Sequence, residues 1–274
     1  MIHVTLRDGR TLSAHDSTNG DHRPLTIVWH HGSPQTGAAL EPHLRAAAAR
    51  HIRWVSYGRP SYGGSTAQPG RSVQDAADDV RQLLDALGVE RFATMGASGG
   101  GPHALACALA MPDRVIAVAT FATLAPYTSD FDWFEGMAGG GPSLRAALRG
   151  VEARVSFERT AEFDPDSFNI GDYRALESRW ESLGTDVGAA ATAGPAGLIA
   201  DDLALVAPWG AGLVDLDVPV LLAQGGDDRV VPASHAYRLL EVLPDAELWL
   251  RPRDGHISIL DLSDLALDWL VARA

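Results

Sequence analysis

The chain has 274 residues, of which 46% are hydrophobic and 21% are charged, a balance typical of a globular protein with one large domain, or one core plus an insertion. Its formal net charge of -13 repels phosphate groups, so neither nucleic acid nor an anionic membrane is expected as a partner. All 22 basic residues are arginine, and the lack of lysine excludes a Walker A phosphate loop, a pyridoxal Schiff base and a Ser-x-x-Lys nucleophile.

The cellular compartment can be inferred from the cysteine content and the apolar runs. Cys107 is the single cysteine, so no internal disulfide can form, and we expect it to be a small core residue. The first ten residues alternate apolar and polar side chains and contain no apolar core of a signal peptide. The longest apolar run, 115–126, is too short to cross a bilayer. We therefore expect a cytoplasmic protein.

In chain order, apolar segments typical of strands alternate with segments typical of helices. Two alternating runs around Asp8 and Gly9 predict a β-hairpin over 3–17. Strands are then predicted over 25–34, 52–58, 91–96, 114–126, 218–226 and 246–252. Helices are predicted over 39–50, 72–88, 102–110, 234–244 and 262–274. Strands that are apolar throughout and alternate with helices predict an α/β fold, with a mostly parallel sheet covered on both faces.

The alternation is interrupted over 127–209, a segment of mixed short helices and loops that is rich in aromatic side chains. We expect residues 1–126 and 210–274 to form the core and 127–209 to form a helical cap. The aromatic side chains can either build the core of a small subdomain or line a lid over a pocket. Trp133, Phe134 and Met137 lie where the segment leaves the sheet, and we expect them to line a substrate pocket.

Ser98 lies between the strand predicted over 91–96 and the helix predicted over 102–110, within the run GASGGG. A strand that turns into a helix within a residue or two forces the turning residue into a strained conformation, and its neighbours must be small. Gly96 and Gly100 meet this need as Gly-x-Ser-x-Gly. The Gly99 N–H then points outward at the helix N-terminus, where negative charge is favoured. The turn can therefore present a nucleophile together with an oxyanion donor.

Two other interpretations of this glycine run compete with the catalytic one. A dinucleotide-binding turn needs the spacing Gly-x-Gly-x-x-Gly, which GASGGG does not have. The glycines can also serve close packing of helix and strand alone. Gly-x-Ser-x-Gly is a weak motif by itself, and its position between strand and helix is what favours catalysis.

A serine nucleophile needs a base and a carboxylate that orients the base. His256 follows the last predicted strand, at the same sheet edge as Ser98. Asp227 and Asp228 follow the strand predicted over 218–226, and the residues alone do not decide between them. His31, at the end of an early strand, is a candidate for the floor of the site.

The chain resembles the α/β-hydrolases along nearly its whole length, through HHGSP, YGRPSYGGS, GASGG, GGDDRVVP and DGHIS, in that order. The family's pattern Gly-x-x-Asp-x-x-Val-Pro, laid on Gly225, Val231 and Pro232, implies that Asp228 is the acid. The family's His-Gly-x turn implies that the backbone N–H of Ser33 is the second oxyanion donor. The family also commonly carries a helical cap between its sixth and seventh strands, where the aromatic-rich segment falls.

The resemblance implies a serine hydrolase that forms an acyl-enzyme on Ser98, with a small and apolar ester as the expected substrate. A serine at this position excludes the dehalogenases and epoxide hydrolases of the fold, which use an aspartate there. Four alternatives remain: a proline iminopeptidase-like enzyme, a C–C bond hydrolase, a cofactor-free haloperoxidase, and a small-molecule receptor with little turnover. The peptidase would recruit cap carboxylates for the substrate amino group, and the candidates are Glu135, Glu152, Glu158 and Glu162.

No cofactor is expected, and no metal either, because the sequence has no His-Glu-x-x-His motif and no cysteine pair. The expected partner is a small-molecule substrate. The sequence leaves the oligomeric state open between monomer and homodimer.

Overall fold

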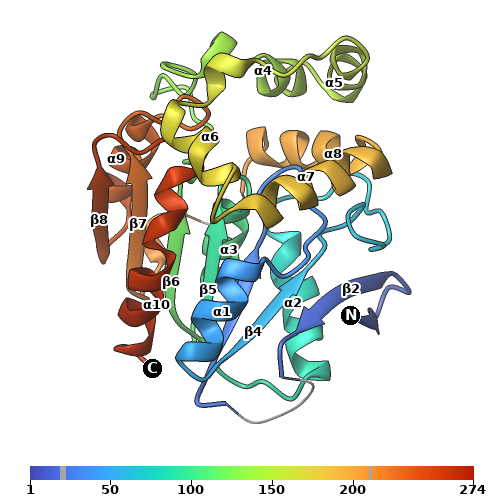
Figure 1. Ribbon diagram of the computed structural model, residues 1–274. Coiled ribbons are helices and arrows are strands. Elements are labelled where there is room, and N and C mark those ends of the chain that lie inside the picture. The colour runs from blue at the N-terminus through green and yellow to red at the C-terminus, as the bar shows by residue number, and fades with distance from the viewer. Residues whose placement is uncertain (19–22, 210–211) are drawn as a thin grey trace.

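The computed structural model describes residues 1–18, 23–209 and 212–274 (Figure 1). Its centre is a sheet of eight strands in the order β1-β2-β4-β3-β5-β6-β7-β8. The strands are β1 (Ile2–Thr5), β2 (Thr11–Asp16), β3 (Leu25–His30), β4 (Ile52–Tyr57), β5 (Phe92–Ala97), β6 (Val115–Phe121), β7 (Val220–Gly225) and β8 (Ala246–Arg251). The pairs β1–β2 and β2–β4 are antiparallel, and all other neighbours are parallel. The predicted α/β class with a mostly parallel sheet is confirmed.

Helices cover both faces of the sheet because successive residues of a strand point to opposite sides. Along β3, Ile27 and Trp29 are buried in one apolar cluster, whereas Val28 between them is buried in the other. The first face is covered by α1 (Glu41–Ala49) and α10 (Ser263–Val271). The second is covered by α2 (Asp75–Ala86), α3 (Gly100–Ala110) and α9 (Ala233–Val242). Burial on both faces explains why these strands are apolar throughout.

The chain between β6 and β7 forms a set of helices above the carboxyl ends of the strands (Figure 1). These are α4 (Pro142–Leu148), α5 (Val151–Glu158), α6 (Ile170–Leu176), α7 (Glu181–Ala193) and α8 (Ala196–Val206), with the short 3-10 helices η1 (Ala138–Gly140), η2 (Pro165–Ser167) and η3 (Leu213–Asp215). All but η3 lie within the predicted range 127–209. The predicted return to the core at residue 210 lies outside the described residues.

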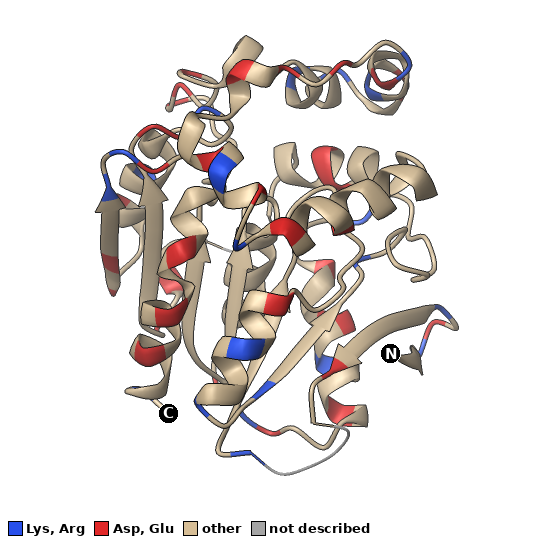
Figure 2. Ribbon diagram, in the orientation of Figure 1, with Lys and Arg blue, Asp and Glu red and all other residues tan. Residues whose placement is uncertain are grey.

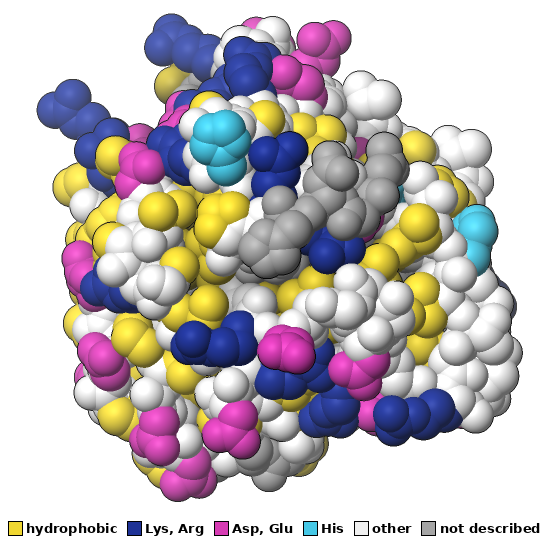
Figure 3. Space-filling view, turned by 90° about the horizontal axis from the view of Figure 1, so that it is seen from below, with side chains coloured by type: hydrophobic (Ala, Val, Ile, Leu, Met, Phe, Trp, Pro, Cys, Tyr) yellow, Lys and Arg dark blue, Asp and Glu magenta, His cyan; other side chains and the backbone are white. Residues whose placement is uncertain are grey.

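Charged side chains are distributed over the whole molecule. Acidic residues lie both on the helices that flank the sheet and on the helices above it (Figure 2). On the face opposite those upper helices, arginine and acidic side chains are interspersed (Figure 3). Within the described ranges no single helix has the length and apolar character to span a membrane, and α7 and α8 meet both criteria only as a pair bent by 101°.

Candidate active site

Four loops that follow parallel strands meet at one edge of the sheet. Ser33 follows β3, Ser98 follows β5, Asp228 follows β7 and His256 follows β8. Because these strands run parallel, their carboxyl ends lie on the same side, which is where open α/β sheets bind their ligands. Side chains separated by up to 223 positions in the numbering are thereby brought to one place.

Ser98 turns the chain from β5 directly into α3. Its φ of 51° is in the left-handed region, which a residue with a side chain seldom adopts and which costs roughly 1–3 kcal/mol. The Ser98 N–H donates to the Phe121 carbonyl at 2.8 Å, and the Ser98 carbonyl accepts the Gly101 N–H at 3.0 Å. These two bonds hold the turn, so the strain falls on a residue whose backbone is fixed on both sides.

The glycines around Ser98 are required by close backbone contacts. A Cβ atom on Gly96 would lie 2.5 Å from the Gly100 carbonyl oxygen, and one on Gly100 would collide with the carbonyl of His30. A Cβ atom on Gly101 would collide with the side chain of Thr123. The glycine run therefore packs the start of α3 against β3 and the end of β6, and this packing is what raises Ser98 above the sheet.

His256 is oriented by Asp228. The imidazole Nδ1 and the Asp228 Oδ2 atom are 2.9 Å apart, and both side chains are buried. The other carboxylate oxygen, Oδ1, accepts the N–H groups of Val230 and Val231 at 2.9 Å each. Asp227 makes no such contact: its side chain is 43% exposed and pairs with Arg229. Of the two adjacent aspartates that the sequence offers, Asp228 is the one that meets the imidazole.

The surroundings of His256 favour its charged form. Burial opposes a charged imidazole, but the charge of Asp228, the hydrogen bond that the imidazole donates to Asp228, and the charge of Asp172 together outweigh it. The pKa of His256 is therefore raised above its ordinary value of 6.5. An imidazole with a raised pKa is a stronger base towards a hydroxyl group.

Two backbone N–H groups lie beside Ser98 and are suited to an oxyanion. A Cβ atom on Gly99 would lie 2.7 Å from the Ser33 Oγ atom, which places the two turns side by side. Within the part of the chain that the structure describes, the N–H groups of Gly99 and Ser33 have no hydrogen-bond partner. The neighbouring Gly32 N–H is bound by the Gln35 Oε1 atom at 2.8 Å, which fixes the Ser33 turn.

A buried ion cluster lies beneath the Ser33 turn, and sequence reasoning did not identify it. Asp201 of α8 is fully buried and pairs with Arg59 and Arg71, at 2.7 Å from the Arg59 Nη2 atom. Its carboxylate also accepts the hydroxyl groups of Ser33 and Tyr62. Burial raises its pKa, but the two arginine charges outweigh this and hold the pKa of Asp201 well below its usual value. The cluster joins α8, a helix of the segment inserted between β6 and β7, to the Ser33 turn.

His31 belongs to this structural framework rather than to the floor of the cavity. Its Nε2 atom accepts the Arg59 backbone N–H at 3.1 Å, and its Nδ1 atom lies 2.6 Å from the Gly32 carbonyl. Burial and the neighbouring Arg59 charge hold its pKa well below 6.5. His31 is absent from the residues that line the cavity, so its predicted place in the pocket was wrong.

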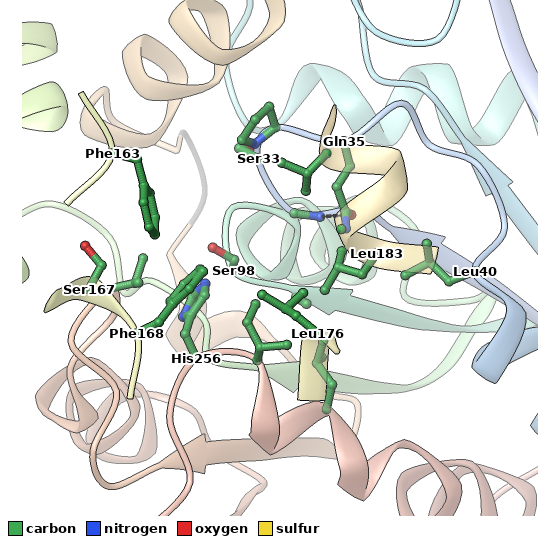
Figure 4. A pocket seen from close by; sticks show the side chains of 18 of the residues that line it. Ser33, Gln35, Leu40, Ser98, Phe163, Ser167, Phe168, Leu176, Leu183 and His256 are labelled. Atoms are coloured by element: carbon green, nitrogen blue, oxygen red, sulfur yellow. Dashed lines mark hydrogen bonds between the residues drawn. The ribbon is translucent and has the colours of Figure 1, made fainter. Parts of the chain in front are cut away.

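A cavity of about 360 Å³ opens above Ser98 (Figure 4). It lies between the sheet edge and the segment from Phe163 to Val187. Its lining is mostly apolar and includes Trp29, Leu40, Phe163, Phe168, Leu176 and Leu183. The side chains of Ser98 and His256 both line it. Among the described residues that line it there is no aspartate, glutamate or arginine side chain.

The Ser98 hydroxyl faces this cavity and makes no hydrogen bond to another described residue. Hydrogen bonds within a catalytic site often become short only in the complex with substrate. Gln35 supplies the cavity with an amide: its Oε1 atom is held by Gly32, and among the described residues its nitrogen has no partner.

The predicted cap lining was also wrong. Trp133, Phe134 and Met137 are buried in the same apolar cluster as α9, and none of them lines the cavity. The Trp133 Nε1–H donates to the Ala125 carbonyl at 2.7 Å, and its ring packs against His235. These side chains anchor the start of the inserted segment to the core. The cap contribution to the lining comes from later residues, between Phe163 and Val187.

Two carboxylates of the inserted segment that contact the site, Asp172 and Asp201, were not identified from the sequence. The only signals were an Asn-x-x-Asp spacing at the start of α6 and two adjacent aspartates within the apolar helix α8. Within the described residues, no group of three or more histidine, cysteine, aspartate or glutamate side chains is arranged to hold a metal ion.

A model of the alpha/beta hydrolase fold family matches residues 26–261. The chain is 27% identical, over 91% of its length and 89% of the relative's, to the protein that carries the name carbamate hydrolase RutD in Caulobacter sp. strain K31. It is 28% identical, over 71% of its length and 68% of the relative's, to a 2-hydroxy-6-oxo-6-phenylhexa-2,4-dienoate hydrolase of Comamonas testosteroni. An esterase of Thermogutta terrifontis has the same fold, with a TM-score of 0.73 at 20% identity over 99% of this chain and 98% of that one.

Proposed function

Because the chain belongs to the alpha/beta hydrolase fold family, we propose that it is a serine hydrolase that cleaves uncharged, apolar carboxylic esters through an acyl-enzyme on Ser98. The observation that carries the proposal is the convergence of a strained serine and an aspartate-bound histidine on one apolar cavity. Acyl transfer needs a nucleophile, a base and a group that orients the base, and the candidates Ser98, His256 and Asp228 come from three separate loops.

The proposed mechanism gives each of these side chains one role. His256 takes the Ser98 proton at Nε2 while the serine oxygen attacks the ester carbonyl. Asp228 accepts the Nδ1–H, which keeps Nε2 free to act as base, and it stabilises the imidazolium that forms. The N–H groups of Gly99 and Ser33 bind the tetrahedral oxyanion. His256 then returns the proton to the departing alkoxide, and the same histidine activates a water molecule that releases the acid.

The lining of the cavity favours an uncharged substrate. A carboxylate buried in an apolar cavity without a cationic partner is strongly destabilised. The relatives that cleave dienoates act on anions, and the described lining contains no arginine to pair with one. The glutamates considered for a peptidase, Glu135, Glu152, Glu158 and Glu162, are likewise absent from the lining. An apolar acyl ester fits the cavity better than either of these substrates.

The helices between β6 and β7 act as the lid of this site. Phe163 lines the cavity and is nevertheless 63% exposed, so it stands at the mouth (Figure 4). Leu176 and Leu183 close the far side from α6 and α7. Substrate enters past Phe163 and is covered by side chains of the inserted segment.

The test is a panel of p-nitrophenyl esters from acetate to octanoate, with p-nitrophenyl hemisuccinate as the charged comparison and proline p-nitroanilide as the peptidase comparison. The neutral esters should turn over at a rate that Ser98→Ala lowers by at least about 10³-fold. The hemisuccinate should be a poor substrate. Turnover of the anilide alone would contradict the ester assignment, and full labelling by a phosphonate without turnover of any ester would indicate a receptor.

A further inference from the structure

Asp172, at the start of α6 in the inserted segment, is fully buried against the loop that carries His256. We propose that Asp172 is a positioning residue for His256: it holds the backbone of the catalytic loop and supplies a second negative charge to the imidazole. The proposal rests on the proposed function of His256 as the base. It assigns to the lid a part in building the catalytic centre.

The Asp172 carboxylate is saturated by donors from this loop. Its Oδ1 atom accepts the N–H groups of Ile257 and Ser258 at 2.8 Å each, and the Ser258 hydroxyl at 2.9 Å. Its Oδ2 atom accepts the His256 N–H at 3.1 Å. Three consecutive backbone N–H groups, beginning with that of His256, therefore converge on one carboxylate. A carboxylate is the side chain suited to this place because it accepts at both oxygens and donates at neither.

The close approach of α6 requires a glycine immediately before His256. A Cβ atom on Gly255 would collide with the Asp172 Oδ2 atom. The Gly255 N–H is bound by the Ser258 Oγ atom at 2.8 Å, and this hydroxyl in turn donates to Asp172. The segment Asp-Gly-His-Ile-Ser thus leaves space for the Asp172 carboxylate, which lies 82 positions or more away in the numbering, and donates hydrogen bonds to it.

Asn169, which caps the start of α6, also contacts the loops beside His256. Its side chain and that of Asp172 form a reciprocal capping box at the start of α6. The Asn169 Nδ2 atom also donates to the Asp227 carboxylate at 3.1 Å and to the Arg253 carbonyl at 3.4 Å. A capping box alone needs only the Asn169 N–H as a partner for Asp172, so the four bonds to the His256 loop are additional.

The charge of Asp172 adds to that of Asp228. Among the described residues, these are the two carboxylates on other elements whose charge acts on the imidazole, and both favour its charged form against the effect of burial. On the loop itself, Asp254 is the nearest carboxylate in sequence, and it pairs with Arg251 at 3.6 Å. Loss of the Asp172 charge should therefore lower the pKa of His256, because one of the groups that favour the imidazolium is removed.

The same helix contacts the substrate cavity. Leu176, one turn after Asp172 on α6, lines the cavity, and Phe168 lines it just before the helix. The element that would touch the bound acyl group is thus also the element that fixes the base.

The decisive experiment compares Asp172→Asn with Asp227→Asn, which removes the same charge from a carboxylate that does not contact the His256 backbone. In Asp172→Asn, kcat on a neutral ester should fall roughly 10- to 100-fold with KM little changed, because a displaced base affects chemistry rather than binding. The imidazole pKa of His256, followed by NMR titration, should fall by roughly 0.5–1 pH unit. Asp227→Asn should leave both quantities as in the wild type, because an asparagine oxygen can still accept the Asn169 amide.

An unchanged imidazole pKa and kcat in folded Asp172→Asn would overturn the proposal. If this variant does not fold, Ser258→Ala serves instead, because it removes one bond to Asp172 and keeps the carboxylate; it should lower kcat at constant KM, and an unchanged kcat would overturn the positioning role. The NMR titration does not depend on turnover. A wild type that hydrolyses no ester would therefore contradict the proposed function and still allow Asp172 to be tested.

Discussion

Replacing Asp228 with asparagine changes which nitrogen of His256 carries the proton. The Asp228 Oδ1 atom accepts two backbone N–H groups, from Val230 and Val231, at 2.9 Å each. An asparagine NH₂ group in that position would face two donors, so the amide oxygen must stay there. The NH₂ group then takes the place of Oδ2 and points at Nδ1 of His256, 2.9 Å away. Nδ1 must become the acceptor, and the proton moves to Nε2.

A histidine protonated at Nε2 cannot accept the Ser98 proton. The expected loss in kcat is about 10⁴-fold, the size that a reversed tautomer produces in a serine triad. This corresponds to about 5.4 kcal/mol in activation free energy. Binding of an apolar ester should change little, because Asp228 is not among the residues that line the cavity.

The assay is steady-state hydrolysis of p-nitrophenyl butyrate by the wild type, Asp228→Asn and Asp227→Asn. The neighbouring Asp227 is a matched control, because it is half-exposed and pairs with Arg229. Asp227→Asn should keep kcat within about twofold of the wild type, as expected for a surface ion pair. A kcat in Asp228→Asn above about 1% of the wild-type value, or an equal loss in both variants, would refute the tautomer argument.

Other features of the site lead to measurable outcomes. Asp201→Asn should lower the free energy of unfolding, measured with urea, by about 3–5 kcal/mol, because two buried arginines lose their charged partner. The control Asp78→Asn, in an exposed ion pair, should lower it by less than about 1 kcal/mol. Equal losses in the two variants would contradict the role of the ion cluster. Gln35→Glu keeps the acceptor for the Gly32 N–H but removes the amide donor. The variant should therefore lose any preference of the wild type for a methoxyacetate over a butyrate ester. A preference that survives would show that Gln35 does not face the substrate. The kcat/KM of the wild type should fall on acidification with a midpoint above pH 6.5. Because the pKa of His256 is raised, its neutral, basic form is lost at a higher pH than usual. A midpoint below pH 6.5 would contradict this.

The core could be predicted from the sequence because its elements are locally encoded. Strands such as β3 are apolar throughout, and their order along the chain is sufficient to predict a parallel sheet. The turn at Ser98 was predictable for a related reason: a strand that enters a helix through Gly-x-Ser-x-Gly has few ways to fold. The φ of 51° at Ser98 and the contacts at Gly96 and Gly100 follow from that constraint.

The lining of the cavity could not be predicted in the same way. In the segment between β6 and β7, Trp133 and Phe163 are both large aromatic residues, and sequence alone does not tell which one faces the core and which one faces the cavity. The structure buries Trp133 against α9 and leaves Phe163 at the mouth of the cavity. Asp172 and Asp201 were missed because their partners, the His256 loop and the two arginines, lie far away in the chain. A buried carboxylate is recognisable only once its donors are known.

The most direct measurement of the central claim is covalent trapping of the nucleophile. The wild type and Ser98→Ala are treated with a fluorophosphonate, and the adduct is located by mass spectrometry of the intact protein and of its peptides. The wild type should gain one phosphonyl group, on the peptide that contains Ser98, with loss of ester hydrolysis in the same proportion. Ser98→Ala should gain none. An adduct on another residue, or equal labelling of the two proteins, would contradict a mechanism in which His256 and Asp228 activate Ser98.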